Sequence, residues 1–410
     1  MKSIRIAIVG GGSAGPTAAL FLKRQGHEVS LFEKVPKPSA VGAGVLLQPT
    51  GLQVLHELEL GDFIESHGAR VEALFSKNSH SKTLLDLHYG DIRPGLYGLG
   101  IHRGVLCEAL FNSLSRQNIP NFCGVKIMDY QCDASQQVRL QDEEGKSYGP
   151  YDLLILAEGA KSNLRQKMKG FKRATPYPWG ALWYIGEDRQ NRFQGRLYQV
   201  VEGTELMVGF LPTGYSVNSK QPLVSFFYSV LNTKKDETRA DFENVKKTVF
   251  RLVPEAQEVL EQIQDPNQLL YAGYWDVVMN QWHDGPVLAI GDAAHAMSPQ
   301  LGQGVNLGLY DAKVLAECVS ESSTLPEALI HYESRRKRHL KFYQFATRWL
   351  TPFFQSNSKS LGVLRDVGFS FSQNFSFLKK EMVKGMAGIK RGIVRKDLRM
   401  NPLQKNRDES

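Results

Sequence analysis

The chain has 410 residues, of which 42% are hydrophobic and 22% are charged. This composition is typical of a globular protein of two or three domains and excludes a disordered or fibrous chain. The formal net charge is +8, but residues 379–410 hold ten Lys or Arg against four Asp or Glu, so most of the excess lies in the tail. The body is nearly balanced, which argues against a nucleic-acid groove over its surface.

Four scattered cysteines indicate neither a metal site nor a disulfide scaffold. They form no CxxC pair and no Cys/His cluster, so we expect free buried thiols in a reducing compartment and no bound metal. No stretch approaches the roughly 18 uninterrupted apolar residues of a membrane span, and no signal peptide precedes the first strand. The sequence therefore predicts a cytoplasmic protein.

A glycine-rich turn follows the first predicted strand, which is buried and runs over residues 4–9. The turn consists of Gly10, Gly11, Gly12, Ser13, Ala14 and Gly15. Gly10 permits a tight turn, Gly12 lets a diphosphate approach the backbone, and Gly15 lets the next helix pack closely against the strand. The pattern predicts a dinucleotide cradle in which the helix N-terminus faces the phosphates.

The next two elements support the same interpretation. A helix is predicted from Pro16 to Gln25 and stops at Gly26, and a second strand over residues 28–33 ends in Glu33, with Lys34 after it. Glu33 lies 18 residues after Gly15, near the offset at which an acid accepts hydrogen bonds from the adenosine ribose. This unit alone does not choose between NAD and FAD.

A second motif follows another predicted strand, at residues 286–290. It consists of Gly291, Asp292, Ala293, Ala294 and His295, followed by Pro299, Gln300, Leu301, Gly302, Gln303, Gly304, Val305 and Asn306. Asp292 at the carboxyl end of a strand is suited to bind a polyhydroxyl chain such as the ribitol of a flavin. Apolar residues at helical spacing predict a helix that begins near Gln303 and directs its first amides at the flavin edge.

The residues from Gly291 to Asn306 resemble, in order, the flavin motif of the p-hydroxybenzoate-hydroxylase-like flavoprotein monooxygenases. That family also has an acidic motif after a middle strand, which Glu158 and Gly159 resemble, and Ser162 and Arg165 match it as well. Arg103 resembles the family's arginine near the flavin diphosphate. Gly44 and Val45 resemble the segment that passes beside the flavin ring.

The resemblance implies noncovalent FAD and a transiently bound co-substrate, NADPH or NADH. In this family the reduced flavin reacts with oxygen to give a C4a-hydroperoxide, which hydroxylates an aromatic substrate such as a phenol. Pro299, Gly302, Gln303 and Gly304 would then shape the reactive flavin face. The sequence identifies no catalytic acid or base: His295 is expected to be a structural neighbour of the flavin loop, and His102 is expected not to attach FAD.

The predicted fold is α/β: an FAD-binding Rossmann-like (GR2-type) parallel sheet, an inserted antiparallel-sheet substrate domain and a helical C-terminus. The FAD-binding domain is assigned to residues 1–70, 95–175 and 278–345, and the substrate domain to 71–94 and 176–277. C-terminal helices are expected over 346–394, and a basic tail over 395–410. Aromatic residues between Tyr177 and Tyr228 are interpreted mainly as sheet core.

The C-terminal region leaves a choice between two interpretations. Leu378, Met382, Met386, Ile389 and Ile393 form an apolar stripe next to basic residues, which could be a helix lying on a membrane surface. Docking of the stripe on the protein itself is favoured, because three nearby glycines weaken the helix. Peripheral membrane contact through the basic C-terminus and the oligomeric state both stay open.

Three other functions remain as alternatives. A halogenase and a reductase of isoprenoid or other alkenes share the FAD scaffold, although the halogenase motif WxWxIP is absent. A noncatalytic flavin-binding partner protein is a third. The segment over 351–366 also resembles ubiquinone-pathway hydroxylases, which would imply a greasy phenolic substrate.

Overall fold

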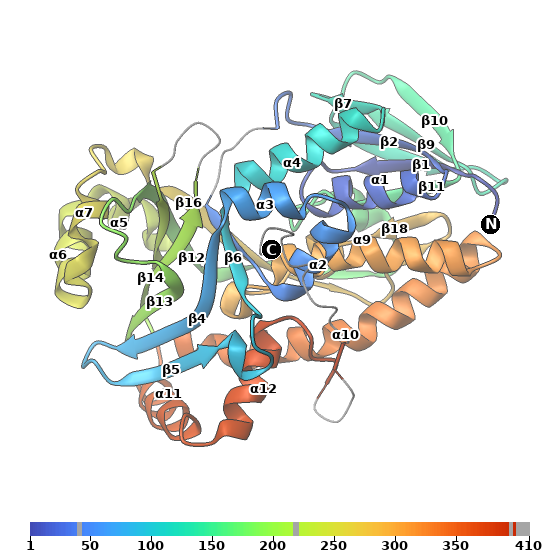
Figure 1. The fold of residues 1–410 in the computed structure, drawn as a ribbon. Helices are drawn as coiled ribbons and strands as arrows, with labels where there is room; N and C mark the ends of the chain where they lie inside the picture. The colour runs from blue at the N-terminus through green and yellow to red at the C-terminus, as the bar shows by residue number, and fades with distance from the viewer. Residues whose placement is uncertain (39–42, 216–220, 393–396, 399–410) are drawn as a thin grey trace, which may run out of the picture.

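The computed structural model describes residues 1–38, 43–215, 221–392 and 397–398. The described part contains a parallel sheet, a larger mixed sheet and a group of C-terminal helices beneath them (Figure 1). This arrangement is the α/β fold that the sequence predicts, with the flavin motifs on the parallel sheet.

The parallel sheet, called here the cofactor sheet, has the strand order β17-β18-β11-β1-β2-β7. Its strands are β1 (Arg5–Val9), β2 (Glu28–Glu33), β7 (Asn121–Cys123), β11 (Leu153–Leu156), β17 (His283–Asp284) and β18 (Val287–Ala289). Only the β17–β18 pair is antiparallel. All four residues of β11 and all three of β18 are buried, as expected for strands that are covered on both faces.

Helices pack against the cofactor sheet within one apolar core. They are α1 (Ala14–Arg24), α2 (Pro49–Glu57), α3 (Gly61–His67), α4 (Arg103–Arg116), α8 (Asp292–His295) and α9 (Gly304–Glu321). Helix α1 begins two residues before the predicted Pro16 and ends at Arg24. Pro16 still lies in its first turn, where a missing N–H removes no helical bond.

The large sheet has the order β16-β12-β15-β14-β13-β4-β6-β3, and β5 pairs with β4. Its strands are β3 (Gly44–Leu47), β4 (Ala69–Asn78), β5 (Thr83–His88), β6 (Gly98–His102), β12 (Phe171–Glu187), β13 (Gly195–Glu202), β14 (Leu206–Gly214), β15 (Leu223–Leu231) and β16 (Leu270–Met279). The sheet is antiparallel as predicted, except that β13 and β4 pair in parallel.

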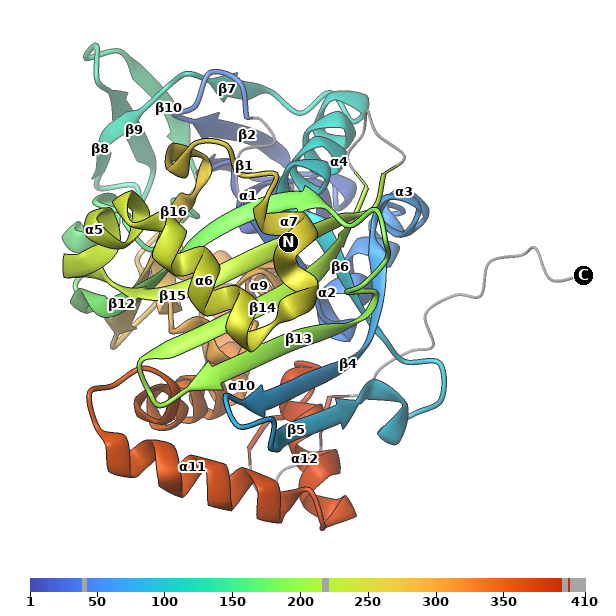
Figure 2. The same ribbon diagram turned by 90° about the vertical axis from the view of Figure 1, so that its left-hand side faces the viewer.

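Three short helices cover one face of the large sheet (Figure 2). They are α5 (Lys235–Ala240), α6 (Phe242–Leu252) and α7 (Gln257–Leu260). Apolar residues of α6, such as Val245 and Val249, share a core with Phe210 and Phe226 of the sheet. Most of the aromatic residues in this region are therefore core, as predicted, whereas Tyr215 is exposed.

A small antiparallel sheet was not predicted. It consists of β8 (Ile127–Cys132), β9 (Val138–Asp142) and β10 (Ser147–Tyr151). Six single-turn 3-10 helices complete the described elements: η1 (Tyr89–Asp91), η2 (Leu164–Lys167), η3 (Asn232–Lys234), η4 (Pro254–Ala256), η5 (Pro266–Gln268) and η6 (Pro299–Leu301).

The C-terminal region is helical, as predicted. It consists of α10 (Leu325–Phe354), α11 (Lys359–Ser372) and α12 (Ser376–Met386). The predicted apolar stripe is not one continuous helix, because α12 stops at Met386 before Gly388, whose φ is +84°. Met382, Met386 and Ile389 pack against the protein, whereas Leu378 is exposed. Ile393 and nearly all of the predicted tail, residues 395–396 and 399–410, lie outside the described residues.

The domain boundaries remain a prediction, and two features bear on them. Strand β12 runs through the boundary placed at 175/176, and β3 and β6 pair within the large sheet although they were assigned to the FAD-binding domain. The cysteine prediction is partly wrong: all four thiols are free, but Cys318 is buried and Cys132 is exposed. Within the described residues, no helix is long and apolar enough to cross a bilayer.

Candidate FAD and substrate site

The glycine-rich turn between β1 and α1 brings three backbone segments together. A Cβ on Gly10 would lie 2.3 Å from the Ala157 carbonyl oxygen, and one on Gly15 would lie 2.0 Å from the Gly10 oxygen. Gly10 also has φ +117°, a conformation that side chains disfavour. A Cβ on Gly12, in contrast, would meet no protein atom within 4 Å, so its backbone borders open space.

Glu33, at the end of β2, closes the rim of this turn. One of its carboxylate oxygens accepts a hydrogen bond from the Gly11 N–H at 2.5 Å, and the other accepts from the Val35 N–H at 2.8 Å. Each carboxylate oxygen has a second lone pair, so Glu33 can still accept from a ribose hydroxyl. Lys34 lies close enough to lower the pKa of Glu158, the acid that follows β11.

Glu158 follows β11 and lies between two cations and a hydroxyl. The Ser162 hydroxyl donates to it at 2.5 Å. Burial raises the pKa of Glu158, while Ser162, Arg165 and Lys34 oppose that rise. The sequence-predicted acid, serine and arginine of the middle motif are thus brought together at the carboxyl end of β11.

Arg165 joins the middle motif to the loop after β18. Its side chain is 1% exposed and donates hydrogen bonds to the carbonyl oxygens of Gly159, Ala160 and Ala293. Because a buried guanidinium needs acceptors, these bonds fix both loops relative to each other. Arg165 thus ties the two loops together, while its buried Nε has no hydrogen-bond partner among the described residues.

Asp292 is the first residue of α8 and has an unusual environment. Its side chain is exposed, yet the pKa of its carboxyl is raised by burial among protein atoms, against the effects of His295, Arg103 and Arg165. An acid that is both open to solvent and surrounded by protein must face a concave space. A Cβ on Gly304 would lie 3.7 Å from its Oδ1, so the N-terminus of α9 faces the same space.

Two glutamines beside this space have buried polar atoms without partners. Gln48 accepts from the Tyr89 hydroxyl at 2.5 Å, but its Nε2 has no hydrogen-bond partner among the described residues. Gln303 donates to the Met386 carbonyl oxygen at 2.5 Å, but its Oε1 has none. Buried polar atoms are normally satisfied, and eight more atoms on other described residues also have no partner. The two glutamine atoms stand out because they belong to residues at the flavin motif.

Asn306 holds the loop from Pro299 to Gln303, called here the flavin loop, against the segment that follows Gly44 and Val45. Its Oδ1 accepts from the Gln48 N–H at 2.8 Å, and its Nδ2 donates to the carbonyl oxygens of Leu46 and Gly302. Gly302 has φ +60°, which allows the chain to turn between Pro299 and α9. Val305, in the first turn of α9, is half-buried.

Gly44, the first residue of β3, contacts β15, a strand that is not its neighbour in the large sheet. Its N–H donates to the Ser225 hydroxyl at 3.0 Å, and a Cβ at this position would lie 2.2 Å from the same oxygen. Val45 beside it is half-buried. Arg103 is exposed at the start of α4 and acts electrostatically on Asp292, so it lies on the same side of the site.

His295 is part of a buried network and not of the open space. Its Nε2 lies 2.6 Å from Asp311, which also accepts from Arg336 at 2.5 Å and from the Gly291 N–H at 2.7 Å. Burial alone would raise the pKa of Asp311, but His295 and Arg336 hold it well below its usual range. The expectation that His295 is structural fits this geometry. His102 similarly accepts from the Gly104 N–H as the N-cap of α4.

Sequence reasoning missed the contact of the C-terminal segment with this site. The carbonyl oxygens of Met386 and Ala387 accept from Gln303 and Thr50, and the Gly388 oxygen lies 2.9 Å from His339 Nε2. A Cβ on Gly388 would lie 2.3 Å from Thr50 Oγ1. The only signal in the sequence was the run of glycines after α12, which permits such a close approach.

The arrangement fits FAD. An open glycine cradle, acids at the ends of β2, β11 and β18, and unsatisfied amides near α9 follow one another along the carboxyl edge of the cofactor sheet.

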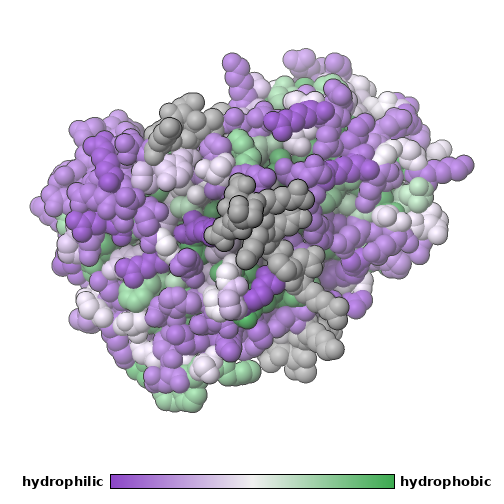
Figure 3. All heavy atoms as spheres, viewed as in Figure 1, coloured by the Kyte–Doolittle hydropathy of each residue, from purple (hydrophilic) through white to green (hydrophobic). Residues whose placement is uncertain are grey.

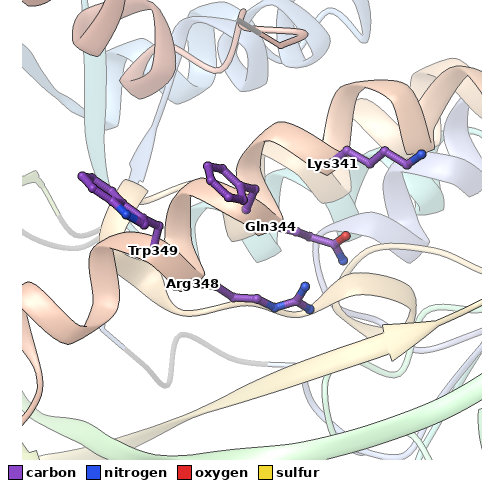
Figure 4. A pocket seen from close by; sticks show the side chains of 5 residues that line it. Lys341, Gln344, Arg348 and Trp349 are labelled. Carbon is purple, nitrogen blue, oxygen red and sulfur yellow. The ribbon is translucent and has the colours of Figure 1, made fainter.

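A separate hollow of about 400 Å³ lies on α10 and is lined by Lys341, Gln344, Phe345, Arg348 and Trp349 (Figure 4). It contains none of the predicted cofactor residues. No group of side chains in the described residues could hold a metal ion.

Comparison with known proteins supports a flavoenzyme. A family profile described as FAD binding domain matches residues 3–343. The 3-amino-4-hydroxybenzoate 2-monooxygenase of Streptomyces cremeus is 28% identical, over 82% of this chain and 84% of its own. The kynurenine 3-monooxygenase of Salinispora arenicola is 28% identical, over 82% and 76%. The Klebsiella pneumoniae enzyme HpxO, solved with FAD and uric acid, has a TM-score of 0.78 at 20% identity and covers 93% of this chain and 97% of its own.

The fold and the site thus define a flavin-dependent oxidoreductase. The chain belongs to the FAD-binding-domain family and, within it, to the class A FAD-dependent aromatic monooxygenases.

Proposed function

We propose that this monooxygenase uses NADPH or NADH to hydroxylate a small planar ring that carries a hydroxyl or amino group. The names of the relatives describe such substrates: an aminohydroxybenzoate, kynurenine and, for a Klebsiella oxytoca hydroxylase 26% identical to this chain, urate. Bound FAD would supply the oxygen chemistry, with electrons from the nicotinamide. The protein would bind and orient the ring and exclude water.

The observation that carries the proposal is the pair of unsatisfied amides at Gln48 and Gln303. Both residues are at most 2% exposed. Gln48 Nε2 would lie 3.7 Å from a Cβ on Gly302, at the loop that the sequence assigns to the reactive flavin face, and Gln303 follows Gly302 in that loop, with its Oε1 near Gly388. Leaving buried polar atoms without a partner costs roughly 1–3 kcal/mol each, so a ligand with complementary groups is favoured there. The flavin ring edge has such groups.

The other site residues divide the cofactor between them in this proposal. Gly10, Gly12, Ser13, Ala14 and Gly15 would hold the diphosphate, with Arg103 nearby, and Glu33 and Lys34 the adenosine half. Gly291 and Asp292 would hold the ribitol chain. The Gly304 and Val305 amides at the start of α9 would stabilise negative charge on the reduced ring. Glu158 and Gly159 would border the diphosphate.

The test measures NAD(P)H oxidation by the FAD-loaded protein under isotopically labelled oxygen, with a panel of hydroxylated and aminated rings. We expect at least one ring to accelerate the oxidation and to gain one labelled oxygen atom. Oxidation that stays unstimulated by every ring, together with reduction of an alkene, would support the reductase alternative. Incorporation of chloride or bromide into the product, when that halide is added to the assay, would support the halogenase.

A cytoplasmic location is part of the same proposal. All four cysteines are free, which is typical of proteins in a reducing compartment. The nicotinamide co-substrate is also an intracellular metabolite. The protein fused to a reporter that folds only in the cytoplasm should give the reporter's signal in cells. Secretion of the intact chain would contradict this location.

A further inference from the structure

Helices α11 and α12 present an apolar surface that no described residue covers. Its side chains are between 41% and 70% exposed. The members of this apolar face are Val363, Leu364, Val367, Phe371, Phe375, Phe377 and Leu378. Apolar side chains gather along the lower edge of the molecule in Figure 3, where Figure 1 places the same two helices. Phe371 and Phe375 contact each other between the two helices, and an exposed apolar area of this kind marks an interaction site.

The inner side of α11 is fixed to the protein, so the outer side is free for another role. Arg365 is 3% exposed and donates to the carbonyl oxygens of Gly203 and Phe353. Phe369 stacks on Phe354. Val363, Val367 and Phe371 are spaced by four residues and lie on the opposite side of the helix. The apolar face is therefore a rigid feature and not a consequence of a loosely attached helix.

The charges around the apolar face are mainly positive. Asp366 is the only acid between residues 359 and 380, and it pairs with Arg365. Lys359, Lys379 and Lys380 have no ion pair within the described part of the chain. Two neighbouring acids outside this stretch have partners of their own. Asp86 on the adjoining β5 pairs with His88, and Glu381 on α12 pairs with Lys384 and Lys390. The lysines that flank the apolar residues are therefore free to attract an anionic surface.

We propose that this face docks on the surface of an anionic lipid bilayer. Helix α11 lies along the outer edge of the molecule (Figure 2), so its apolar side chains can enter the headgroup region together while the helix axis stays parallel to the membrane. The flanking lysines meet the negative surface potential of the leaflet. A second copy of the chain on the same face would instead bring like charges together. This contact is distinct from one through the basic tail.

The test is co-sedimentation of the FAD-loaded protein with vesicles of phosphatidylcholine, with and without phosphatidylglycerol. We expect binding that requires phosphatidylglycerol and weakens as salt rises. The double variant Val367→Asp/Phe371→Asp should lose roughly a hundredfold or more in vesicle affinity, because each substitution removes a buried apolar group and adds a negative charge. Lys379→Glu/Lys380→Glu should weaken binding and flatten its salt dependence.

Matched controls separate this face from the rest of the molecule. Met128→Asp replaces another exposed apolar residue, on β8, and should leave vesicle binding unchanged. A chain that ends at Leu398 lacks residues 399–410 and should also bind as the wild type does. Circular dichroism and flavin content confirm that each variant is folded.

Equal vesicle binding by the wild type and the folded double variant would overturn the proposal. So would loss of binding in the chain that ends at Leu398, which would assign the contact to the tail. A wild-type protein that ignores vesicles but forms a dimer that Val367→Asp/Phe371→Asp abolishes would assign the face to a second copy.

Discussion

Two glycines of the first turn have different physical tasks, and alanine substitutions separate them. Gly12→Ala adds a Cβ that meets no protein atom within 4 Å, so the fold should be as stable as before without FAD. The same Cβ should enter the space of the diphosphate and weaken FAD binding by about tenfold or more. Isothermal titration with FAD and thermal unfolding of the FAD-free protein measure both effects.

Gly15→Ala should instead destabilise the fold itself. Its Cβ would lie 2.0 Å from the Gly10 carbonyl oxygen, so α1 has to move away from β1 at a cost of about 1–3 kcal/mol. The control is Gly368→Ala on the exposed side of α11, where a Cβ meets nothing and alanine should raise helix stability slightly. Equal effects of Gly12→Ala and Gly15→Ala on stability would contradict this division.

Asp311 is the acceptor on which the buried network depends. Asp311→Asn leaves Arg336, which is 0% exposed, without its anion, and should cost about 3–5 kcal/mol in the free energy of unfolding. Glu321→Gln, at the end of the same helix, removes an exposed pair with Arg335 and should cost about 1 kcal/mol or less. Urea unfolding of both variants near neutral pH tests the contrast.

The same network predicts an acid sensitivity. The pKa of Asp311 is far lower in the folded protein than its ordinary value of 3.8, so its stabilising effect is complete above that value and is lost as the pH falls below it. Burial and Arg336 also lower the pKa of His339, so protonation of His339 opposes folding as the pH falls below 6.5. Stability should therefore fall more steeply below about pH 6 in the wild type than in His339→Gln.

At the level of elements, the segment after α12 holds the flavin loop in place. Gly388→Ala should force the segment away from Thr50 and Gln303, because its Cβ would lie 2.3 Å from Thr50 Oγ1. We expect faster FAD release and more NAD(P)H oxidation without product. Gly392→Ala shares the backbone strain, since Gly392 has φ +140°, but meets no neighbour, and should have the smaller effect. Similar flavin release rates in the two variants would argue against a positioning role.

The sequence predicted elements best where a local pattern determines them. Strand β2 has the predicted bounds, and α9 begins at Gly304, one residue after its predicted start. Helix α1 begins before its predicted start because Pro16 fits several positions of a first turn. The predicted apolar stripe is not one helix because the chain turns at Gly388, where it contacts distant residues. The sheet β8–β10 was missed because no motif marks its short strands, which lie within the segment assigned to the FAD-binding domain.

At the level of the whole molecule, FAD in the proposed site would join segments from widely separated parts of the chain, so it should stabilise the folded state as a unit. An FAD concentration of about 100 times Kd should add ~2.7 kcal/mol to the free energy of unfolding. Thermal unfolding with and without FAD measures this gain. If Asp292 and Gln303 face the cofactor, Asp292→Ala should reduce the gain, whereas Asp284→Ala on β17 should not.

The sequence also predicted which distant segments meet, because parallel strands place their carboxyl ends at one edge of a sheet. Glu33, Glu158 and Asp292 lie at the ends of β2, β11 and β18 for that reason. It could not predict the contact of Gln303 with Met386, because no shared motif marks the two segments. Nor could it predict the contact of Gly44 with Ser225, because their strands, β3 and β15, are not neighbours in the order of the large sheet. The buried network around Asp311 was missed for the same reason.

The strand order of the cofactor sheet has a consequence for biosynthesis. A ribosome produces β1, β2 and α1 well before β18, Asp292 and Gln303, and Met386, which accepts from Gln303, later still. Domains fold as their residues emerge, so the glycine-rich turn is made long before the loop after β18 that completes the proposed site. We therefore expect flavin loading only after the segment through Gln303 has emerged, and a cell short of riboflavin should accumulate apoprotein with an open cleft, the form that proteases and chaperones recognise.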